Sequence, residues 1–270
     1  MSRYEISKAK LDEIIKKIPD LKPLWSKIKV LNPDIISMKF GHLSRIPLAS
    51  VCLNDSLSAL GEARYALRES FAHEVWYNEE AKNINVSTAN YFIRYYSDDV
   101  ALRLYSASDH LANAIIDFLP IGKKSLLRHH KKASSVSLTV GKYLMRQRPK
   151  HPISISISKL VKNSAWTDTI TYRNNWVHNR PPLISGFGIQ WHRKKRWTEI
   201  IKDRVVTGHR MEFGGLGDKP NYSPVQLRSI VTQALSAFVE TYESVSNFYI
   251  EKLIKNGIII DASSVNVKLK

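Results

Sequence analysis

The chain has 270 residues, of which 43% are hydrophobic and 10% aromatic, so it can bury a sizeable core and has the composition of a globular protein. Its 41 lysine and arginine residues outnumber its 24 acidic residues, and the formal net charge of +17 favours a polyanionic partner. The single cysteine, Cys52, excludes an intrachain disulfide framework and a paired-cysteine zinc site. We find no signal-peptide pattern and no apolar run of membrane-spanning length, and therefore expect a cytoplasmic protein without a membrane partner.

The first 54 residues are predicted to elaborate a larger domain. An amphipathic pattern over residues 4–18 predicts a short helix that ends at Pro19. Residues 20–53 contain Pro23, Pro33 and Pro47, which predicts an irregular segment.

Two long helices are expected next, over residues 56–80 with Asp55 as the cap and over residues 87–119. The second carries Asp109 on an otherwise apolar stripe. Burial of an unpaired carboxylate costs several kcal/mol, so Asp109 needs a cation such as Arg173, or else a local cap or pair.

A basic segment follows. Between Phe118 and Thr167 the chain has lysine and arginine residues but no acidic residue. Within it we expect a helix over residues 134–147 and a shorter apolar run over residues 153–161. Nucleic acid is the favoured partner; a solvated surface and an anionic membrane face are the alternatives. The cations assigned to nucleic-acid binding are Lys123, Lys124, Arg128, Lys131, Lys132, Arg146 and Arg148.

Residues 164–180 form a helical pattern with Ser164 as the expected cap and three polar residues of chemical interest near its end. Trp166, Ile170 and Val177 recur at helical spacing, and Arg173 falls on their stripe. Asn174 and His178 are four residues apart and therefore share a neighbouring face at the last turn. Either the three form a site, or Arg173 and His178 simply stabilise the helix end against its dipole.

Residues 183–222 are rich in glycine and alternate in polarity, which predicts a small β-hairpin-like insertion. Two tryptophans around four cations suit stacking on unpaired bases and phosphate contacts. An ordinary amphipathic strand with cation-π pairs is an equal alternative. The binding residues assigned to this segment are Trp191, Arg193, Lys194, Lys195, Arg196 and Trp197.

The last helix is predicted over residues 223–255, with Pro224 at its first position and a stop at Asn256-Gly257. Beyond it, alternating residues predict a strand that pairs with the edge of the insertion or with another chain.

Together these elements predict a mainly α fold. Four long helices, at 56–80, 87–119, 164–180 and 223–255, would form an up-and-down bundle with a basic helical connection and the hairpin-like insertion. The predicted division is an N-terminal elaboration over residues 1–54 and a bundle domain over residues 55–270 that contains the insertion 183–222.

The sequence Arg173-Asn174, three residues, His178 at the end of a late helix resembles the Arg, four to six residues, His signature of the HEPN superfamily. The segment around Asp109 also resembles a second-helix motif of some HEPN families, whose polar residue lies close to the Arg and His. Other pairs have similar spacing but lack the Asn and the helix end: Arg68 to His73, Arg103 to His110, Arg146 to His151 and Arg204 to His209.

The resemblance implies a helical bundle with metal-independent endoribonuclease activity, without a cofactor, in a toxin or antiphage-defence system. It implies that Arg173, Asn174, His178 and Asp109 form the catalytic site at the interface of a homodimer, with RNA as substrate and an antitoxin or defence protein as a further partner. Some HEPN toxins carry a modifiable Tyr two residues after the His, where this chain has Arg180. The alternative is a non-catalytic HEPN-like subunit that binds nucleic acid or serves as a scaffold.

Overall fold

The computed structural model describes residues 5–28, 32–41, 44–80, 85–122, 125–126, 136–178, 182, 184–185, 192–201, 204–212, 221–261 and 266–269. Its described part is mainly α-helical, as the sequence predicts. None of its described helices combines the length and the apolar character needed to cross a membrane.

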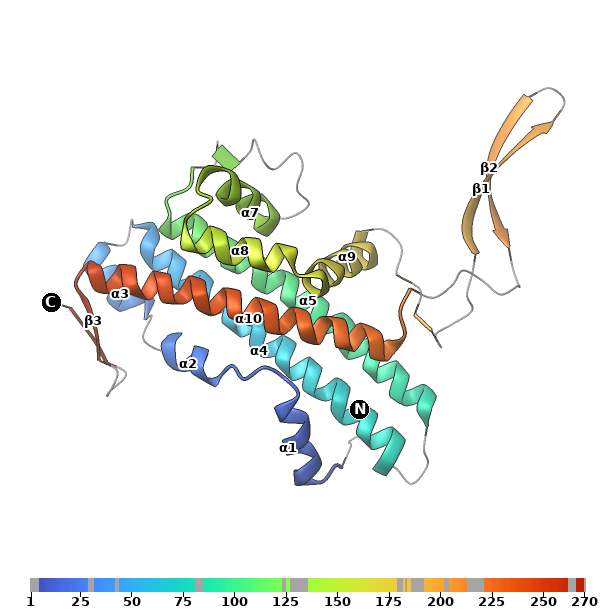
Figure 1. Cartoon of the computed structure of the whole chain (residues 1–270), viewed down its shortest axis with the longest axis horizontal. Coiled ribbons are helices and arrows are strands. Elements are labelled where there is room, and N and C mark those ends of the chain that lie inside the picture. Colours follow the sequence, from blue (N-terminus) through green and yellow to red (C-terminus); the bar gives the residue numbers. More distant parts are fainter. Residues whose placement is uncertain are drawn as a thin grey trace.

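Two long helices, α4 (Arg45–Val75) and α5 (Val86–Phe118), pack against each other in antiparallel directions (Figure 1). The Ser56 hydroxyl of α4 donates to the Ala107 carbonyl of α5 at 2.8 Å. Small buried side chains, among them Ala63 and Ala107, line the contact and let the two backbones approach closely.

Helix α10 (Pro224–Lys255) runs antiparallel to α4 and covers both long helices. Its start is set by Ser223, which forms a capping box with Gln226, and by Pro224 at the first helical position. The buried Tyr242 and Tyr249 donate their hydroxyls to carbonyls of α4 at 2.9 and 2.6 Å. The helix predicted over residues 223–255 is thus confirmed.

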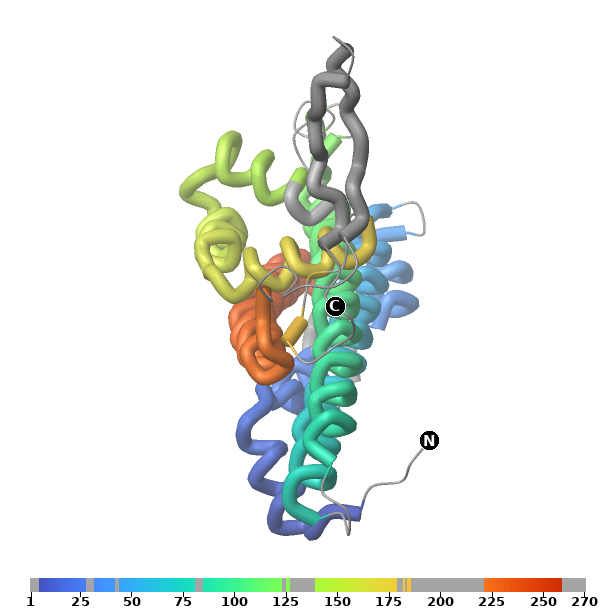
Figure 2. The backbone as a smooth tube through the Cα atoms, turned by 90° about the vertical axis from the view of Figure 1, so that its right-hand side faces the viewer, coloured from blue at the N-terminus to red at the C-terminus, as the bar shows by residue number. Residues whose placement is uncertain are grey.

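Three shorter helices pack on α5 and α10. They are α7 (Val136–Gln147), α8 (Pro152–Lys162) and α9 (Ser164–His178), and Figure 2 shows α8 and α9 above α10. Asn163, not Ser164, caps α9, because its side chain accepts from the Trp166 N–H at 2.9 Å. Ser164 is instead the first residue of the helix.

The N-terminal region is more helical than predicted. It contains α1 (Lys8–Lys16), α2 (Lys22–Ile28) and α3 (Pro33–Phe40), so the irregular segment expected over residues 20–53 is wrong where the structure describes it. The prolines did not exclude helix because Pro33 and Pro47 both lie in a first turn, where the missing N–H has no intrahelical partner to lose.

Helix α4 begins after the Ser44 cap, eleven residues before the predicted start at residue 56. Asp55 therefore lies inside the helix rather than capping it. The boundary drawn between residues 54 and 55 falls within this continuous helix, which packs on α3 as well as on α5. A short π-helical turn, η1 (Trp76–Glu80), continues α4 at its other end.

Within the described ranges, four strands form two antiparallel pairs. β1 (His192–Ile201) pairs with β2 (Arg204–Glu212), with a register shift between Arg193 and Lys195. β3 (Ile258–Asp261) pairs with β4 (Asn266–Leu269). The terminal strand therefore pairs with its own neighbour and not with the insertion.

His73, one of the alternative signature histidines, belongs to the core of the α4 and α5 pair. Its buried ring stacks on Phe92 at 4.1 Å between centroids and lies 5.4 Å from the ring of Tyr96. This burial lowers the pKa of His73 from its usual 6.5, and the nearby Glu69 raises it by less. The neutral imidazole therefore serves the packing of the core.

Acid should destabilise the protein through His73. Because the folded-state pKa lies below the unfolded value, the stability contributed by the neutral ring is present above pH 6.5 and is lost as the pH falls through the folded pKa. Replacing His73 with Phe should keep the ring stacked on Phe92 and remove the part of the acid-induced loss of stability that is due to His73. Urea unfolding at about pH 7.5 and pH 5 measures it. The control is His110→Asn, at a partly exposed histidine near Asp55. Equal pH dependence in His73→Phe and wild type would contradict the assignment.

Candidate functional site

The end of α9 brings together the three polar residues that the sequence singled out. The Arg173 Nη1 donates to Asn174 Oδ1 at 3.1 Å and to His178 Nε2 at 3.2 Å. Since a guanidinium has only donors, the imidazole Nε2 must be the acceptor, and a neutral ring then carries its proton on Nδ1. One cation therefore holds both the amide and the imidazole.

Helix α5 supplies the floor of this site. The Arg173 guanidinium carbon lies 3.6 Å from the centre of the Tyr105 ring, a close cation-π contact. The Arg173 side chain is half-buried, and its Nε has no hydrogen-bond partner in the described part of the chain. Asp109 lies one helical turn beyond Tyr105 and is half-buried. Its pairing with Arg173 stays a prediction.

Tyr172 attaches the preceding turn of α9 to the same face of α5. Its buried hydroxyl donates to Asp98 Oδ1, and Arg94 Nε lies 3.6 Å from the other carboxylate oxygen. Burial raises the pKa of Asp98, an effect that the Tyr172 hydrogen bond and the Arg94 charge only partly oppose. Burial and the Asp98 charge also raise the pKa of Tyr172, so the phenol keeps its proton and acts as the donor.

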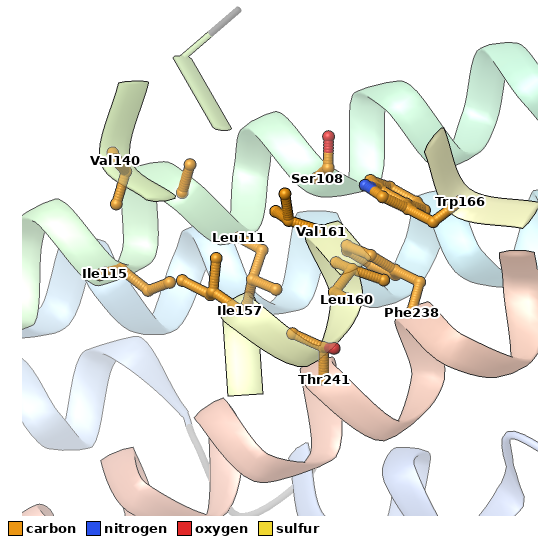
Figure 3. Close-up of a pocket in the computed structure, with 11 residues that line it drawn as sticks. Ser108, Leu111, Ile115, Val140, Ile157, Leu160, Val161, Trp166, Phe238 and Thr241 are labelled. Carbon is orange, nitrogen blue, oxygen red and sulfur yellow. The ribbon is translucent and has the colours of Figure 1, made fainter. Parts of the chain in front are cut away.

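Aromatic packing fixes the other end of α9. The Trp166 indole stacks on Phe238 of α10 with centroids 5.2 Å apart and planes 14° apart. Figure 3 shows both rings beside a small apolar pocket, which Ser108 and Leu160 also line. Its volume of about 40 Å³ has room for little more than water, so we read it as a packing feature.

The last turn of α9 is open to solvent. His178 and Trp176 are exposed, and the Val177 side chain is 42% exposed. Trp166 and Ile170 are buried as predicted, but Val177 does not continue their buried stripe. Neither Tyr105 nor Trp176 was among the predicted site residues, and the four-residue spacing of Tyr105 and Asp109 was the available signal for Tyr105.

Two of the predicted nucleic-acid contacts, Arg146 and Arg148, are exposed at and just after the end of α7. Arg148 lies near Lys252 and His151, and the pKa of each is lowered by burial first and by the Arg148 charge second. The Lys252 ammonium donates to the Phe118 carbonyl. These groups form a basic surface at the C-terminal end of α10.

That basic surface is far from His178. The His151 ring contacts Phe248 near the end of α10, whereas Tyr172 contacts Tyr222, just before α10 begins. With a rise of 1.5 Å per residue the separation along α10 is about 35–40 Å. The structure therefore does not bring Arg146 and Arg148 to the end of α9, although the basic segment directly precedes this helix in sequence.

The remaining predicted contacts are only partly described. In β1 the backbone places Lys195 opposite Arg210 and Arg196 opposite His209, which brings basic positions together across the two strands. Arg193, Lys194 and Trp197 lie in the same strand. Outside the described residues are Lys123, Lys124, Arg128, Lys131, Lys132 and Trp191.

Across the described ranges, no three His, Cys, Asp or Glu side chains gather where they could share a metal ion. No protein-family model matches the sequence, and neither a curated protein nor a solved structure matches it. The geometry of the site is therefore the basis for assigning a function.

Proposed function

We propose that this protein is a metal-independent endoribonuclease of the HEPN type, acting as a toxin or antiphage-defence effector with a four-helix bundle as its core. The observation that carries the proposal is the contact of Arg173 with both Asn174 and His178 at an exposed helix end. A cation in hydrogen-bonding contact with both an amide and an imidazole suits chemistry on a phosphodiester.

The proposed reaction is internal attack of a ribose 2′-hydroxyl on the adjacent phosphorus. His178 Nε2 removes the 2′-hydroxyl proton, the new oxygen–phosphorus bond forms, and the bond to the 5′-oxygen breaks. Arg173 stabilises the negative charge on the phosphoryl oxygens, and Asn174 orients the phosphate or the imidazole. The products are a 2′,3′-cyclic phosphate and a 5′-hydroxyl.

The contact between Arg173 and His178 supports this division of roles. In the free protein Arg173 Nη1 donates to the nitrogen that would act as the base. A phosphate that enters the site offers the guanidinium a charged acceptor, which forms a stronger hydrogen bond than a neutral imidazole does. When Arg173 Nη1 donates its hydrogen bond to the phosphate instead, His178 Nε2 is free to accept the proton of the ribose hydroxyl.

The proposal includes a two-fold dimer in which two α9 ends face each other. Trp176 and Val177 leave apolar surface exposed beside His178, and such a surface suits contact with a second copy. A dimer would supply two imidazoles to one cleft, so the second His178, in its protonated form, would donate a proton to the leaving 5′-oxygen.

Incubation of the pure protein with mixed RNAs, with and without EDTA, tests the proposal. We expect EDTA-resistant cleavage of RNA, intact DNA, and sedimentation of the active protein as a dimer at micromolar concentration. Cleavage that EDTA abolishes would refute the mechanism. Activity by a species that sediments only as a monomer would refute the composite cleft.

The second candidate is a non-catalytic nucleic-acid-binding or scaffold subunit of a defence or toxin-antitoxin complex, with an antitoxin or defence protein as its partner. The specific observation in its favour is that the lone pair of His178 Nε2 is already engaged by Arg173. If the wild-type protein binds RNA but cleaves none, this candidate replaces the nuclease.

A further inference from the structure

An aromatic surface lies on α5 near the candidate site. Tyr91 and Tyr95 are one helical turn apart and are 51% and 55% exposed. Their rings are nearly parallel, with centroids 6.2 Å apart and planes at 16°. Phe92 and Tyr96 meet them edge to face, at 5.4 and 5.2 Å between centroids. The two tyrosine rings are thus supported from within the fold while much of their surface is open.

The same stripe of α5 leads to Arg173. Tyr91, Tyr95, Asp98 and Tyr105 follow one another at helical spacing, so they share one face of the helix. Tyr95 is ten residues from Tyr105, which corresponds to about 15 Å along the helix. This surface is much closer to the site than Arg146 and Arg148 are.

The second half of α9 lies against the part of α5 between the tyrosine pair and Ser108. Trp166, near the start of α9, lines the same pocket as Ser108 of α5 (Figure 3), and Tyr172, further along α9, reaches Asp98. Arg173, the next residue of α9, places its guanidinium over Tyr105, and His178 contacts that guanidinium, so Tyr105 marks the position of these groups on α5.

The charges beside the tyrosines are compatible with a polyanion. The two neighbouring carboxylates each contact an arginine: Asp98 contacts Arg94, and Asp99 contacts Arg103 at 3.2 Å, an arginine that it shares with Glu62 of α4. The chain as a whole has a formal net charge of +17. These contacts offset part of the repulsion between the carboxylates and a phosphate backbone.

We propose that Tyr91 and Tyr95 form a stacking platform for the bases of single-stranded RNA whose backbone continues along α5 to Arg173 and His178. This inference rests on the proposed function, and it names unpaired RNA as the substrate class. Exposed aromatic rings bind single strands because every base has a stacking face, whereas a duplex keeps its bases stacked internally. A span of about 15 Å corresponds to roughly four nucleotides of a stacked strand.

Tyrosine and arginine are also enriched at protein interfaces, so a docked protein is the competing occupant of this surface. The observations favour RNA, because the surface is continuous with a site whose cation and imidazole suit a phosphodiester, and because the net charge attracts polyanions. The experiment must therefore separate RNA binding from protein association.

The test measures binding of a single-stranded RNA of about ten nucleotides, with 2-aminopurine in place of one base, to His178→Ala protein. In this background the double change Tyr91→Leu and Tyr95→Leu should raise Kd by roughly tenfold or more and abolish the quenching of 2-aminopurine. The double change to Phe keeps both rings and should preserve Kd and quenching. Binding of duplex RNA should respond little to either change.

The control is Tyr65→Leu, at a tyrosine of α4 that is 56% exposed but has the Arg68 guanidinium 4.7 Å from its ring centre. Thermal unfolding checks that each variant is folded. Unchanged RNA affinity in the folded leucine double variant overturns the platform, as does an equal loss in Tyr65→Leu. If the leucine variant loses only self-association, the surface docks a protein. Absence of RNA binding by the wild type itself overturns the proposed function and the platform together, whereas binding without cleavage overturns only the nuclease.

Discussion

Replacing His178 with alanine should lower the rate of RNA cleavage by about 10²–10⁴-fold, the usual contribution of a general acid or base. RNA affinity should change little, because the imidazole of the free protein contacts Arg173 and lies at an exposed helix end. The loss should therefore appear in the single-turnover rate and not in Kd. Gel analysis of end-labelled RNA measures the rate, and the cyclic phosphate at the new 3′ end identifies the reaction.

His110→Ala is the matched control for this experiment. His110 is a partly exposed histidine of α5 that lies 4.0 Å from Asp55 of α4, away from the contacts made by α9. We expect His110→Ala to cleave RNA at the wild-type rate. Full activity of a folded His178→Ala protein would sink the proposed mechanism.

Arg173→Ala is a less selective test. It would remove the guanidinium from Tyr105 and from Asn174 as well as from any substrate. If Asp109 is its counter-ion, the variant would also leave a half-buried carboxylate unpaired, which costs stability. Loss of activity in this variant therefore needs a measurement of its unfolding before it is assigned to catalysis.

RNA affinity should fall by several orders of magnitude as salt rises from about 50 to 200 mM. A protein that neutralises six to ten phosphates loses about 10³–10⁵ in affinity over this range, because it releases bound counterions. Changing Lys194, Lys195 and Arg196 together to Gln should make the slope of log Kd against log salt shallower. The decrease should equal the contribution of up to about three phosphate contacts. Fluorescence anisotropy at four salt concentrations measures both slopes.

A control variant with the same change in net charge is Lys8, Lys16 and Lys22 to Gln, at exposed positions in α1 and α2. This variant should keep the wild-type slope if the β1 segment contacts phosphate. Equal slopes for all three proteins would show that β1 is not part of the RNA surface, and a salt-independent Kd would remove the polyelectrolyte argument altogether.

The sequence predicted the long helices because the residues that start and stop a helix lie within a few positions of its ends. Ser223, Pro224 and Gln226 define the start of α10 within four residues, and the structure uses all three. The error at α4 has an equally local cause: Pro47 was read as an interruption, although a proline in the first turn of a helix loses no hydrogen bond.

The sequence by itself determined that Arg173, Asn174 and His178 can meet, since a helix places residues one turn apart on adjoining faces whatever surrounds it. Only the tertiary structure decided that Tyr105 lies under the guanidinium, that Tyr172 is fastened to Asp98, and that Arg148 is tens of ångströms from His178. Helical periodicity shows which residues share a face, but the choice of the facing helix depends on how the whole core packs. Stacking on Tyr105 and burial of Asp98 were therefore invisible in the order of the residues.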